Sequence, residues 1–378
     1  MKISVSAPSG LEGVTKRELY NLLKVDAPAN NGSLTFDGDI VSVAKCNLFL
    51  RTASRVYIVL GSFKAPDFDS LFDGVYNIPV EDYIAYDGKI LINATLVESK
   101  LTANSATCSI VKKAICKRLQ EKSGKNLPET GERYKISVSI HRDYATVYLD
   151  TSGEGLHKRG YRTSVGDAPL KENVASALID LSVWNADRPF VDLFCGSGTL
   201  PIEACLKALN VPPGLNRDFD FLHFKNFNTS FFNEMKETAK SQIKHDINLR
   251  ISGFDIEESQ IKLARIHAEK AGVAKYIHLQ RADMREFSSR FSHGVIITNP
   301  PYGERLLTRN EIVKLYRDFG KVYDSLDNWS CYALTSVTDF ERLFNKKADK
   351  KRKIYNGKLE CTYFSVLGAP PKKNTIKY

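Results

Sequence analysis

Residues 295–302, with the sequence VIITNPPY, decide how the rest of the chain is interpreted. The apolar run from Val295 to Thr298 predicts a buried strand, and Asn299-Pro300-Pro301-Tyr302 follows where that strand ends. Open α/β sheets bind their ligands at the carboxyl ends of their strands. Two consecutive prolines fix φ twice and remove two N–H donors, which leaves a stiff corner with carbonyl groups, an amide and an aromatic ring.

Such a corner suits a planar heterocycle that carries an exocyclic amine. The side-chain oxygen of Asn299 and the carbonyl of Pro300 would each accept one amine hydrogen, and Tyr302 would stack on the ring. These hydrogen bonds would draw the nitrogen lone pair out of conjugation and toward an electrophile. Taken alone, the tetrapeptide fits a tight surface turn equally well, because prolines often follow strands.

The sequence FVDLFCGSGT at residues 190–199 predicts a strand, a glycine-rich turn and the start of a helix. Glycines at 196 and 198 allow positive φ and close approach of a ligand to the backbone. A phosphate-binding loop would carry lysine or further glycines. Asp192, which precedes the turn, instead suits a ligand with a cationic amine, such as S-adenosylmethionine.

Two further predicted strands also end in acids. Asp255 follows the strand from residue 251 and is expected to accept both hydroxyls of a ribose, and Asp283 and Met284 are expected to contact an adenine ring. The spacing from the glycine turn to Asp255 exceeds the ~20 residues of a dinucleotide fingerprint, which argues against an NAD site. The candidate cofactor residues are Asp192, Phe194, Gly196, Ser197, Gly198, Thr199, Asp255, Ile256, Asp283 and Met284.

Composition indicates a globular protein with two or three domains. The chain has 378 residues, of which 43% are hydrophobic and 26% charged, and no apolar run approaches the ~20 residues that span a bilayer. The amino terminus has no secretory signal pattern. Seven scattered cysteines without CxxC pairs predict reduced thiols, no metal site and a cytoplasmic location, with Cys195 a small residue near a turn rather than a nucleophile.

The net charge of +10 gives mild support for a nucleic-acid partner. Residues 106–122 predict a basic amphipathic helix, residues 157–162 a cationic connector, and residues 346–353 a basic segment at a sheet edge. Each could equally be an ordinary solvated face. The candidate RNA-binding residues on the helix and the connector are Lys112, Lys113, Lys117, Arg118, Lys158, Arg159 and Arg162.

The order of predicted elements divides the chain into four parts. Residues 1–60 form a small α+β subdomain, 61–155 a second α+β domain, 156–168 a basic linker and 169–378 an α/β domain with a parallel sheet. An insertion at 210–250 contains the aromatic run Phe219–Phe224, which is expected to pack on the domain core rather than to stack on bases.

With these motifs in place, the sequence resembles a known family. Residues 165–370 resemble a class I S-adenosylmethionine-dependent methyltransferase, through DLFCGSGT at 192–199 and NPPY at 299–302. Residues 60–155 resemble a THUMP domain. The whole chain is similar to THUMP-containing guanine-N2 RNA methyltransferases of the ribosomal RNA large-subunit branch, which are often called N6-adenine-specific DNA methylases because they share the tetrapeptide.

The resemblance implies a Rossmann-like methyltransferase sheet preceded by an α+β ferredoxin-like and THUMP RNA-binding region. It implies S-adenosylmethionine as cofactor, structured ribosomal RNA as partner and methylation of the exocyclic N2 amine of a guanine in 23S rRNA. One alternative is adenine-N6 methylation of DNA or RNA. Another, from a different class, is a non-catalytic RNA-binding or ribosome-assembly factor.

Overall fold

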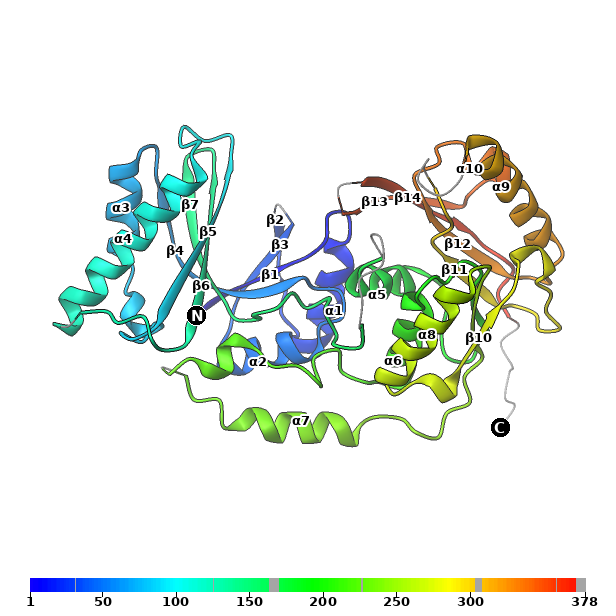
Figure 1. The fold of residues 1–378 in the computed structure, drawn as a ribbon, viewed down its shortest axis with the longest axis horizontal. Helices are drawn as coiled ribbons and strands as arrows, with labels where there is room; N and C mark the ends of the chain where they lie inside the picture. Colours follow the sequence, from blue (N-terminus) through cyan, green and yellow to red (C-terminus); the bar gives the residue numbers. More distant parts are fainter. Residues whose placement is uncertain are drawn as a thin grey trace. The chain divides into compact units, whose positions relative to one another are not determined.

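The computed structural model describes every residue except 31, 125, 163–169, 226, 303–307, 358 and 372–378 (Figure 1). It divides into two compact units, each built from several segments of the chain. The first unit contains Met1–Ala7, Lys16–Leu156 and Gly214–Thr238, and the second contains Pro8–Thr15, His157–Pro213 and Ala239–Tyr378. Part of the predicted basic linker, residues 163–168, lies outside the described residues.

The first unit is built on one seven-stranded sheet in the order β2-β3-β1-β4-β7-β6-β5. All neighbouring strands are antiparallel except β5 and β6. Because β4 pairs with β1 on one side and β7 on the other, the predicted boundary at residue 60 falls inside a shared strand and stays a prediction. The strands are β1 Lys2–Ser6, β2 Ala29–Asn30, β3 Ser33–Asp37, β4 Arg55–Lys64, β5 Lys89–Val97, β6 Arg133–His141 and β7 Tyr144–Asp150.

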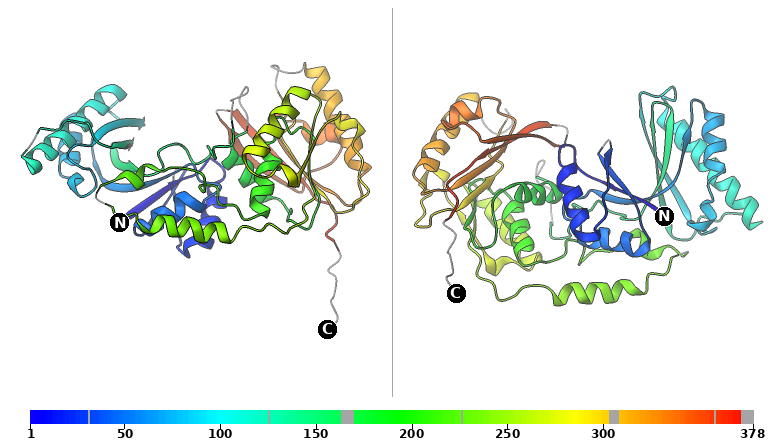
Figure 2. Two further views of the ribbon diagram at one scale, coloured as in Figure 1. Left: turned by 60° about the horizontal axis from the view of Figure 1, so that its bottom comes forward. Right: turned by 180° about the vertical axis from the view of Figure 1, so that it is seen from behind.

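Helices α1 (Glu12–Leu23), α2 (Ile40–Phe49), α3 (Phe68–Tyr76) and α4 (Asn104–Ser123) accompany this sheet, together with the 3₁₀ turn η1 (Val80–Asp82). Asp39 caps α2: its carboxylate accepts the Ser42 N–H, and the Ser42 hydroxyl accepts the Asp39 N–H in return. Gly124 ends α4 with φ of +63°, a conformation that glycine adopts without strain. Helices α3 and α4 pack together beside strands β4 to β7 (Figures 1 and 2).

The second unit has a seven-stranded sheet in the order β10-β9-β8-β11-β12-β14-β13. The first five strands in this order are parallel, which confirms the predicted parallel sheet, and β14 and β13 close it with antiparallel pairs. The strand order reverses between β8 and β11, which makes this the ligand-binding switch point of an open sheet. The strands are β8 Phe190–Asp192, β9 Ile251–Asp255, β10 Ile277–Arg281, β11 Val295–Thr298, β12 Ser330–Thr335, β13 Lys350–Asn356 and β14 Leu359–Val366.

Helices cover both faces of this sheet (Figure 1). One face packs against α5 (Glu172–Leu181), α6 (Thr199–Ala208) and α8 (Glu258–Lys270), joined by Leu11 and Val14 from the amino-terminal segment of the unit. The other face packs against α9 (Arg309–Asp324) and α10 (Phe340–Phe344). Between β10 and β11 the described chain forms only the short 3₁₀ turn η4 (Met284–Glu286), and between α8 and β10 the turn η3 (Ala274–Tyr276).

The aromatic run of the insertion belongs to the first unit, where it includes the turn η2 (Asp220–His223) and precedes α7 (Phe231–Ser241). The Phe224 ring stacks on Tyr134 of β6 at 4.7 Å between ring centroids, and Phe219 and Phe221 are buried. The predicted packing on a core is therefore confirmed. That core, however, is not the core of the α/β domain in which the sequence places the insertion, because Tyr134 supplies the matching ring.

All seven cysteines are free thiols, and five of them are buried. Burial raises the pKa of the Cys195 thiol well above its usual range, which agrees with a packing role beside the glycine turn. No helix in the described part of the chain is long and apolar enough to cross a membrane.

Candidate active site

The two motifs that stand about a hundred residues apart in the sequence are neighbours in the second unit. Strand β11 pairs with β8 in parallel register, Val295 opposite Phe190 and Ile296 opposite Val191. Just beyond this pairing, the Thr298 hydroxyl donates to Asp192 Oδ1 at 2.6 Å. Because Asn299 follows Thr298 directly, this hydrogen bond brings the tetrapeptide beside the glycine turn.

Asp192 is a buried carboxylate, 2% exposed, at the end of β8. Its Oδ1 also accepts the backbone N–H of Phe194 at 3.1 Å, so the side chain shapes the turn that follows it. Burial raises the pKa of Asp192 to about 7, and the nearby charge of Asp255 adds to this increase. The predicted contact between this carboxylate and a cofactor ammonium group stays a prediction.

The glycine turn adopts backbone conformations that other residues rarely take. Gly196 has φ of +50° and Gly198 φ of +84°, and a Cβ at Gly198 would lie 3.0 Å from the Cβ of Ala264 in α8. His267 supports the turn through a 3.1 Å hydrogen bond from Nδ1 to the Ser197 carbonyl. Burial lowers the pKa of His267, which favours the neutral ring with the proton on Nδ1.

Asp255 at the end of β9 holds the other side of the turn. Its Oδ2 accepts the Gly196 N–H at 2.9 Å and its Oδ1 accepts the Glu257 N–H at 2.9 Å. The next side chain, Ile256, is 55% exposed. A Cβ placed on Gly196 would meet no atom nearer than Gln260 Oε1 at 3.9 Å, so the space above the turn is open.

This arrangement fits the nucleoside part of S-adenosylmethionine. An open backbone surface at Gly196 lies beside a carboxylate that suits ribose hydroxyls and an exposed Ile256 side chain that suits an adenine ring. The third acid is less open, because Asp283 caps the Arg285 N–H and pairs with the Arg285 guanidinium at 2.7 Å. Met284 is 3% exposed, so its predicted contact with adenine has little surface on which to form and stays a prediction.

The tetrapeptide presents one feature that its sequence alone does not reveal. Asn299 Oδ1 is buried and has no hydrogen-bond partner among the described residues. An unsatisfied buried acceptor costs ~1–3 kcal/mol, a cost that a ligand donor would remove. The atom therefore marks a position where a ligand N–H fits.

Side chains from neighbouring elements hold this corner in place. The Tyr316 hydroxyl of α9 donates to the Pro301 carbonyl at 3.3 Å and is itself 2.8 Å from Thr335 Oγ1 in β12. The Asn356 amide of β13 donates to the Tyr302 hydroxyl at 3.1 Å. Tyr302 is half-buried against the core, and burial raises its pKa to about 12, so the phenol stays protonated near neutral pH.

Two of the three basic residues of the predicted cationic connector pair with acids of the second unit, and their contact with RNA stays a prediction. Arg159 is buried, with Nε 3.6 Å from the carboxylate of Glu203. Arg162 lies 2.9 Å from Glu172 and donates to Thr199 Oγ1 at 2.6 Å. These buried acids hold the two guanidinium groups within the second unit, where they fasten the connector to the start of α6.

Two of the basic residues predicted on α4 also have partners within the first unit. Arg118 forms a two-pronged ion pair with Glu81, with both distances 2.6 Å, and Lys112 pairs with Glu129 at 2.8 Å. Such pairs reduce the charge that each residue offers to a phosphate. The predicted residues that remain exposed are Lys113, Lys117 and Lys158.

The residues that hold the two motifs in place could not be identified from the sequence. Thr298 carried a weak signal, because it precedes Asn299 at a strand end. The others lie on separate elements and carry no local pattern: His267, Tyr316, Thr335 and Asn356.

Three family models match successive parts of the chain. A ferredoxin-like domain model matches residues 2–57, a THUMP domain model residues 65–150 and an RMKL-like methyltransferase domain model residues 159–365. The last match covers more than half of the chain. The chain belongs to the RMKL-like methyltransferase family. S-Adenosylmethionine is the cofactor of this family member, in agreement with the fit at Gly196, Asp255 and Ile256.

The sequences of individual relatives support membership of this family. The Bacillus subtilis protein named "Putative RNA methyltransferase YpsC" is 39% identical over 98% of this chain and 97% of its own length. "Ribosomal RNA large subunit methyltransferase K/L" of Psychromonas ingrahamii is 31% identical over 97% of this chain and 50% of its own length. The chain therefore spans about half the length of such K/L relatives.

Solved structures show the same fold. The crystal structure of SMU.472, described as "a putative methyltransferase complexed with SAH", has 40% identity and a TM-score of 0.94, covering 98% of this chain and 99% of that chain. A Listeria monocytogenes structure described as a predicted N6-adenine-specific DNA methylase has 40% identity and a TM-score of 0.92, covering 97% of this chain and 96% of that chain. TrmN from Thermus thermophilus, at 18% identity and TM-score 0.68, covering 97% of this chain and 99% of that chain, shares the fold alone.

Proposed function

We propose that this RMKL-like methyltransferase transfers the methyl group of S-adenosylmethionine to the exocyclic N2 amine of a guanine in RNA, and that the RNA is 23S rRNA. The single observation that carries the proposal is the buried, unpartnered Asn299 Oδ1 beside the glycine turn. RNA as the substrate is supported by the THUMP match and by the names of the relatives.

The chain's own residues mainly bind and orient the two reactants. Asp255, Ile256 and the turn at Gly196 would hold the nucleoside part of the cofactor, which when bound supplies an electrophilic methyl group. Asn299 Oδ1 and the Pro300 carbonyl would accept the two hydrogens of the amine and aim its lone pair. Orientation of a bound pair can supply up to ~7–11 kcal/mol of the barrier.

The corner needs no strong base. Because burial raises the pKa of Tyr302 to about 12, its phenol donates or stacks and does not remove a proton near neutral pH. The amine proton becomes acidic only after the nitrogen has been methylated, so it can leave to water. Tyr302, half-buried on one side, would use its remaining surface to stack on the base.

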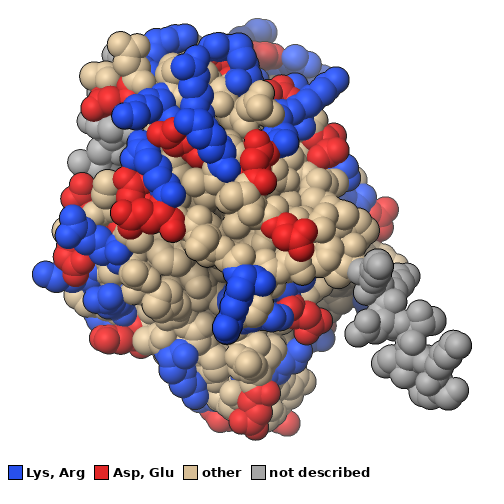
Figure 3. All heavy atoms as spheres, turned by 90° about the vertical axis from the view of Figure 1, so that its right-hand side faces the viewer, with Lys and Arg blue, Asp and Glu red and all other residues tan. Residues whose placement is uncertain are grey.

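A base in structured RNA must leave its stack to reach this corner, at a cost of a few kcal/mol. Contacts to phosphates would offset that cost. Helix α9, which begins seven residues after Tyr302, exposes Lys314 and Arg317, and neither has an ion-pair partner among the described residues. Figure 3 shows lysines and arginines gathered on the upper part of the face where Figure 1 places α9 and α10.

The decisive variant is Asn299→Ala. We expect methyl transfer to RNA to fall by about 10²-fold or more, by analogy with removal of one hydrogen-bonding group from a reacting centre. Binding of S-adenosylhomocysteine, measured by calorimetry, should be unchanged, because Asn299 is not among the residues that would hold the cofactor. Asn233→Ala on the exposed face of α7 is the matched control. Normal transfer by the Asn299→Ala protein would refute the acceptor role.

Product analysis separates the proposal from its nearest rival, adenine-N6 methylation, because both purines present an exocyclic amine next to a ring nitrogen. Total RNA from cells lacking the protein is incubated with the enzyme and labelled cofactor, then digested to nucleosides. Labelled N2-methylguanosine in 23S rRNA is the expected product. Labelled N6-methyladenosine would favour the rival, and tight RNA binding without any labelled nucleoside would favour a non-catalytic factor.

A further inference from the structure

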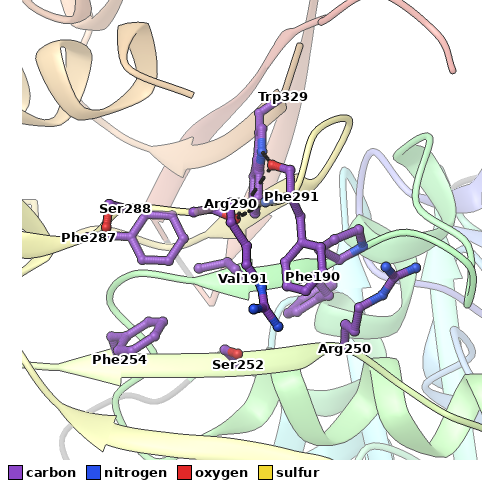
Figure 4. Close-up of a pocket in the computed structure, with 12 residues that line it drawn as sticks. Phe190, Val191, Arg250, Ser252, Phe254, Phe287, Ser288, Arg290, Phe291 and Trp329 are labelled. Atoms are coloured by element: carbon purple, nitrogen blue, oxygen red, sulfur yellow. Dashed lines mark hydrogen bonds between the residues drawn. The ribbon is translucent and has the colours of Figure 1, made fainter. Parts of the chain in front are cut away.

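A pocket of about 240 Å³ lies in the second unit, and none of the candidate active-site residues lines it (Figure 4). Its lining includes Phe190 and Val191 of β8, Arg250 just before β9, and Ser252 and Phe254 within β9. Asp192 and Asp255, in contrast, stand at the carboxyl ends of the same strands. The loop after η4 and the ring of Trp329 complete the lining.

The fold leaves this part of the sheet uncovered by helices. On this face α9 and α10 pack over the β11 and β12 side, with Phe340 and Phe344 in the core they form. Between β10 and β11 the described chain has only η4 and a loop, and that loop supplies Phe287 to Phe291 to the pocket. The opening is therefore a consequence of the short connection between the two strands.

The pocket gathers two positive charges without a negative one. The guanidinium carbons of Arg250 and Arg290 each lie 5.2 Å from the centroid of the Phe291 ring, and no carboxylate stands among the described residues that line the pocket. Arg250 donates to the Asp187 carbonyl, while Arg290 makes no hydrogen bond or ion pair to a described residue. Neither guanidinium group is neutralised by a carboxylate of the described lining, so an anion that enters the pocket would meet positive charge without displacing an acid.

Aromatic rings line the other side of the pocket. Phe254 and Phe287 lie with ring centroids 5.5 Å apart, and Phe287 meets Trp329 at 5.9 Å. The hydroxyls of Ser252 and Ser288 stand on the same lining. At about 240 Å³ the space is just below the ~300 Å³ at which small-molecule pockets usually begin, so it suits one nucleotide rather than several.

We propose that this pocket binds a single phosphate-bearing nucleotide, with the phosphate between Arg250 and Arg290 and the base or sugar against Phe254 and Phe287. Guanidinium groups match phosphate oxygens in pairs, and aromatic side chains accept any base by stacking. The nucleotide comes either from the bound RNA or from free mononucleotides. None of the residues proposed to hold the cofactor or the target base lines the pocket, so its occupation does not depend on the proposed methyl transfer.

The test uses the full chain with the double substitution Arg250→Gln and Arg290→Gln. Calorimetry measures binding of GMP, AMP and inorganic phosphate, and fluorescence anisotropy measures binding of a structured rRNA fragment as a function of salt. We expect the affinity of the double variant to fall at least about tenfold for whichever source occupies the pocket. If that source is RNA, the salt slope should also fall by about one for each phosphate that the variant no longer binds. Binding of S-adenosylhomocysteine should stay unchanged in both proteins.

Two further variants control for misfolding and for the loss of positive charge as such. Lys262→Gln with Lys270→Gln removes two exposed charges from α8 and should leave both nucleotide and RNA binding as they are. Ser288→Glu keeps both arginines but places a carboxylate on the pocket wall, and it should lower the affinity at least about tenfold, as the double variant does. If the double variant binds mononucleotides, phosphate and RNA as tightly as the lysine control does, the proposal is wrong. These experiments measure binding alone, so their outcome does not depend on the result for Asn299→Ala.

Discussion

At the scale of single residues, the buried carboxylate of Asp192 is the group with the most direct physical consequence. It accepts hydrogen bonds from Thr298 and from the Phe194 N–H, yet burial still raises its pKa to about 7. The native state therefore holds a proton that the unfolded chain, with the ordinary value of 3.8, gives up at lower pH.

This difference predicts a pH dependence for the second unit. The native-state proton stabilises the fold fully below about pH 4, and the stabilisation declines as pH rises toward and through 7, by an amount on the order of 4 kcal/mol at most. Asp192→Asn removes the titration. The free energy of unfolding of the variant, relative to the unmodified protein, should therefore rise between pH 5 and pH 8.

Tryptophan fluorescence is a suitable probe, because both tryptophans, Trp184 and Trp329, belong to the second unit. Urea unfolding followed at pH 5, 6, 7 and 8 gives the comparison. Parallel stability profiles for the two proteins would show that Asp192 does not titrate in this range.

The identities of the strand-end residues could be predicted from the sequence, because each follows an apolar run and carries a polar group suited to a ligand. The contacts between them could not. The bond from Thr298 to Asp192 joins residues 106 positions apart and depends on the parallel register of β8 and β11, which no local pattern encodes. The ion pair of Arg159 could not be predicted for the same reason: its partner Glu203 lies on a helix more than forty residues away in the sequence.

At the scale of elements, the glycine turn between β8 and α6 is the most constrained segment. Gly198 combines a φ of +84° with a Cβ position 3.0 Å from Ala264. Replacement by alanine should cost about 1–3 kcal/mol from backbone strain and push α8 away from the turn. We expect Gly198→Ala to weaken binding of S-adenosylhomocysteine and to lower the unfolding midpoint seen by tryptophan fluorescence.

A second glycine in the same unit provides the control. Gly13 lies in α1, and a Cβ there would meet nothing within 4 Å. Gly13→Ala should therefore stabilise the helix by ~0.5–1 kcal/mol and leave cofactor binding alone. Equal behaviour of the two alanine variants would show that the turn tolerates a side chain.

Helix α9 gives a prediction about RNA rather than about the cofactor. Lys314→Gln with Arg317→Gln should weaken RNA binding and lower the slope of log K against log salt by about one for each phosphate group that the variant no longer neutralises. The Lys262 and Lys270 double variant on α8 removes the same charge and should leave the slope unchanged. An unaltered slope for the α9 variant would place the RNA on another surface.

Strand and helix types could largely be predicted from periodicity, and α4, β8, β9 and β11 lie close to the positions expected from the sequence. The order of strands in each sheet could not. In particular, nothing local to residues 55–64 indicates that one strand joins β1 to β7 and so makes a single sheet from two predicted subdomains.

At the scale of the whole molecule, each unit is completed by a segment that the sequence assigns to the other part of the chain. Residues 214–238 belong to the first unit, and residues 8–15 belong to the second, where Leu11 and Val14 are buried in the core. Composition shifts along the chain could indicate a boundary near residue 156. They could not reveal these exchanged segments, because each packs on side chains that lie far away in the sequence.

Replacement of Phe224 tests whether residues 214–238 stabilise the first unit. Because its ring stacks on Tyr134 and is 2% exposed, Phe224→Ala should destabilise the first unit by about 3–5 kcal/mol. Hydrogen exchange of peptides from β6 should become faster. The tryptophan signal of the second unit should keep its unfolding midpoint, and a shift of that midpoint instead, with β6 unchanged, would contradict the assignment.

The shared segments also constrain how the protein is made. Synthesis proceeds from the amino terminus, so the sheet that contains β6 has to wait for Phe219, Phe221 and Phe224, which emerge from the ribosome long after its last strand. Until then Tyr134 lacks the ring that covers it. The nascent polypeptide therefore exposes an aromatic surface that is prone to aggregation. The exposure lasts for roughly 70 to 90 codons, which is about 4–18 seconds at ~5–20 residues per second. A translational pause within that interval would prolong it.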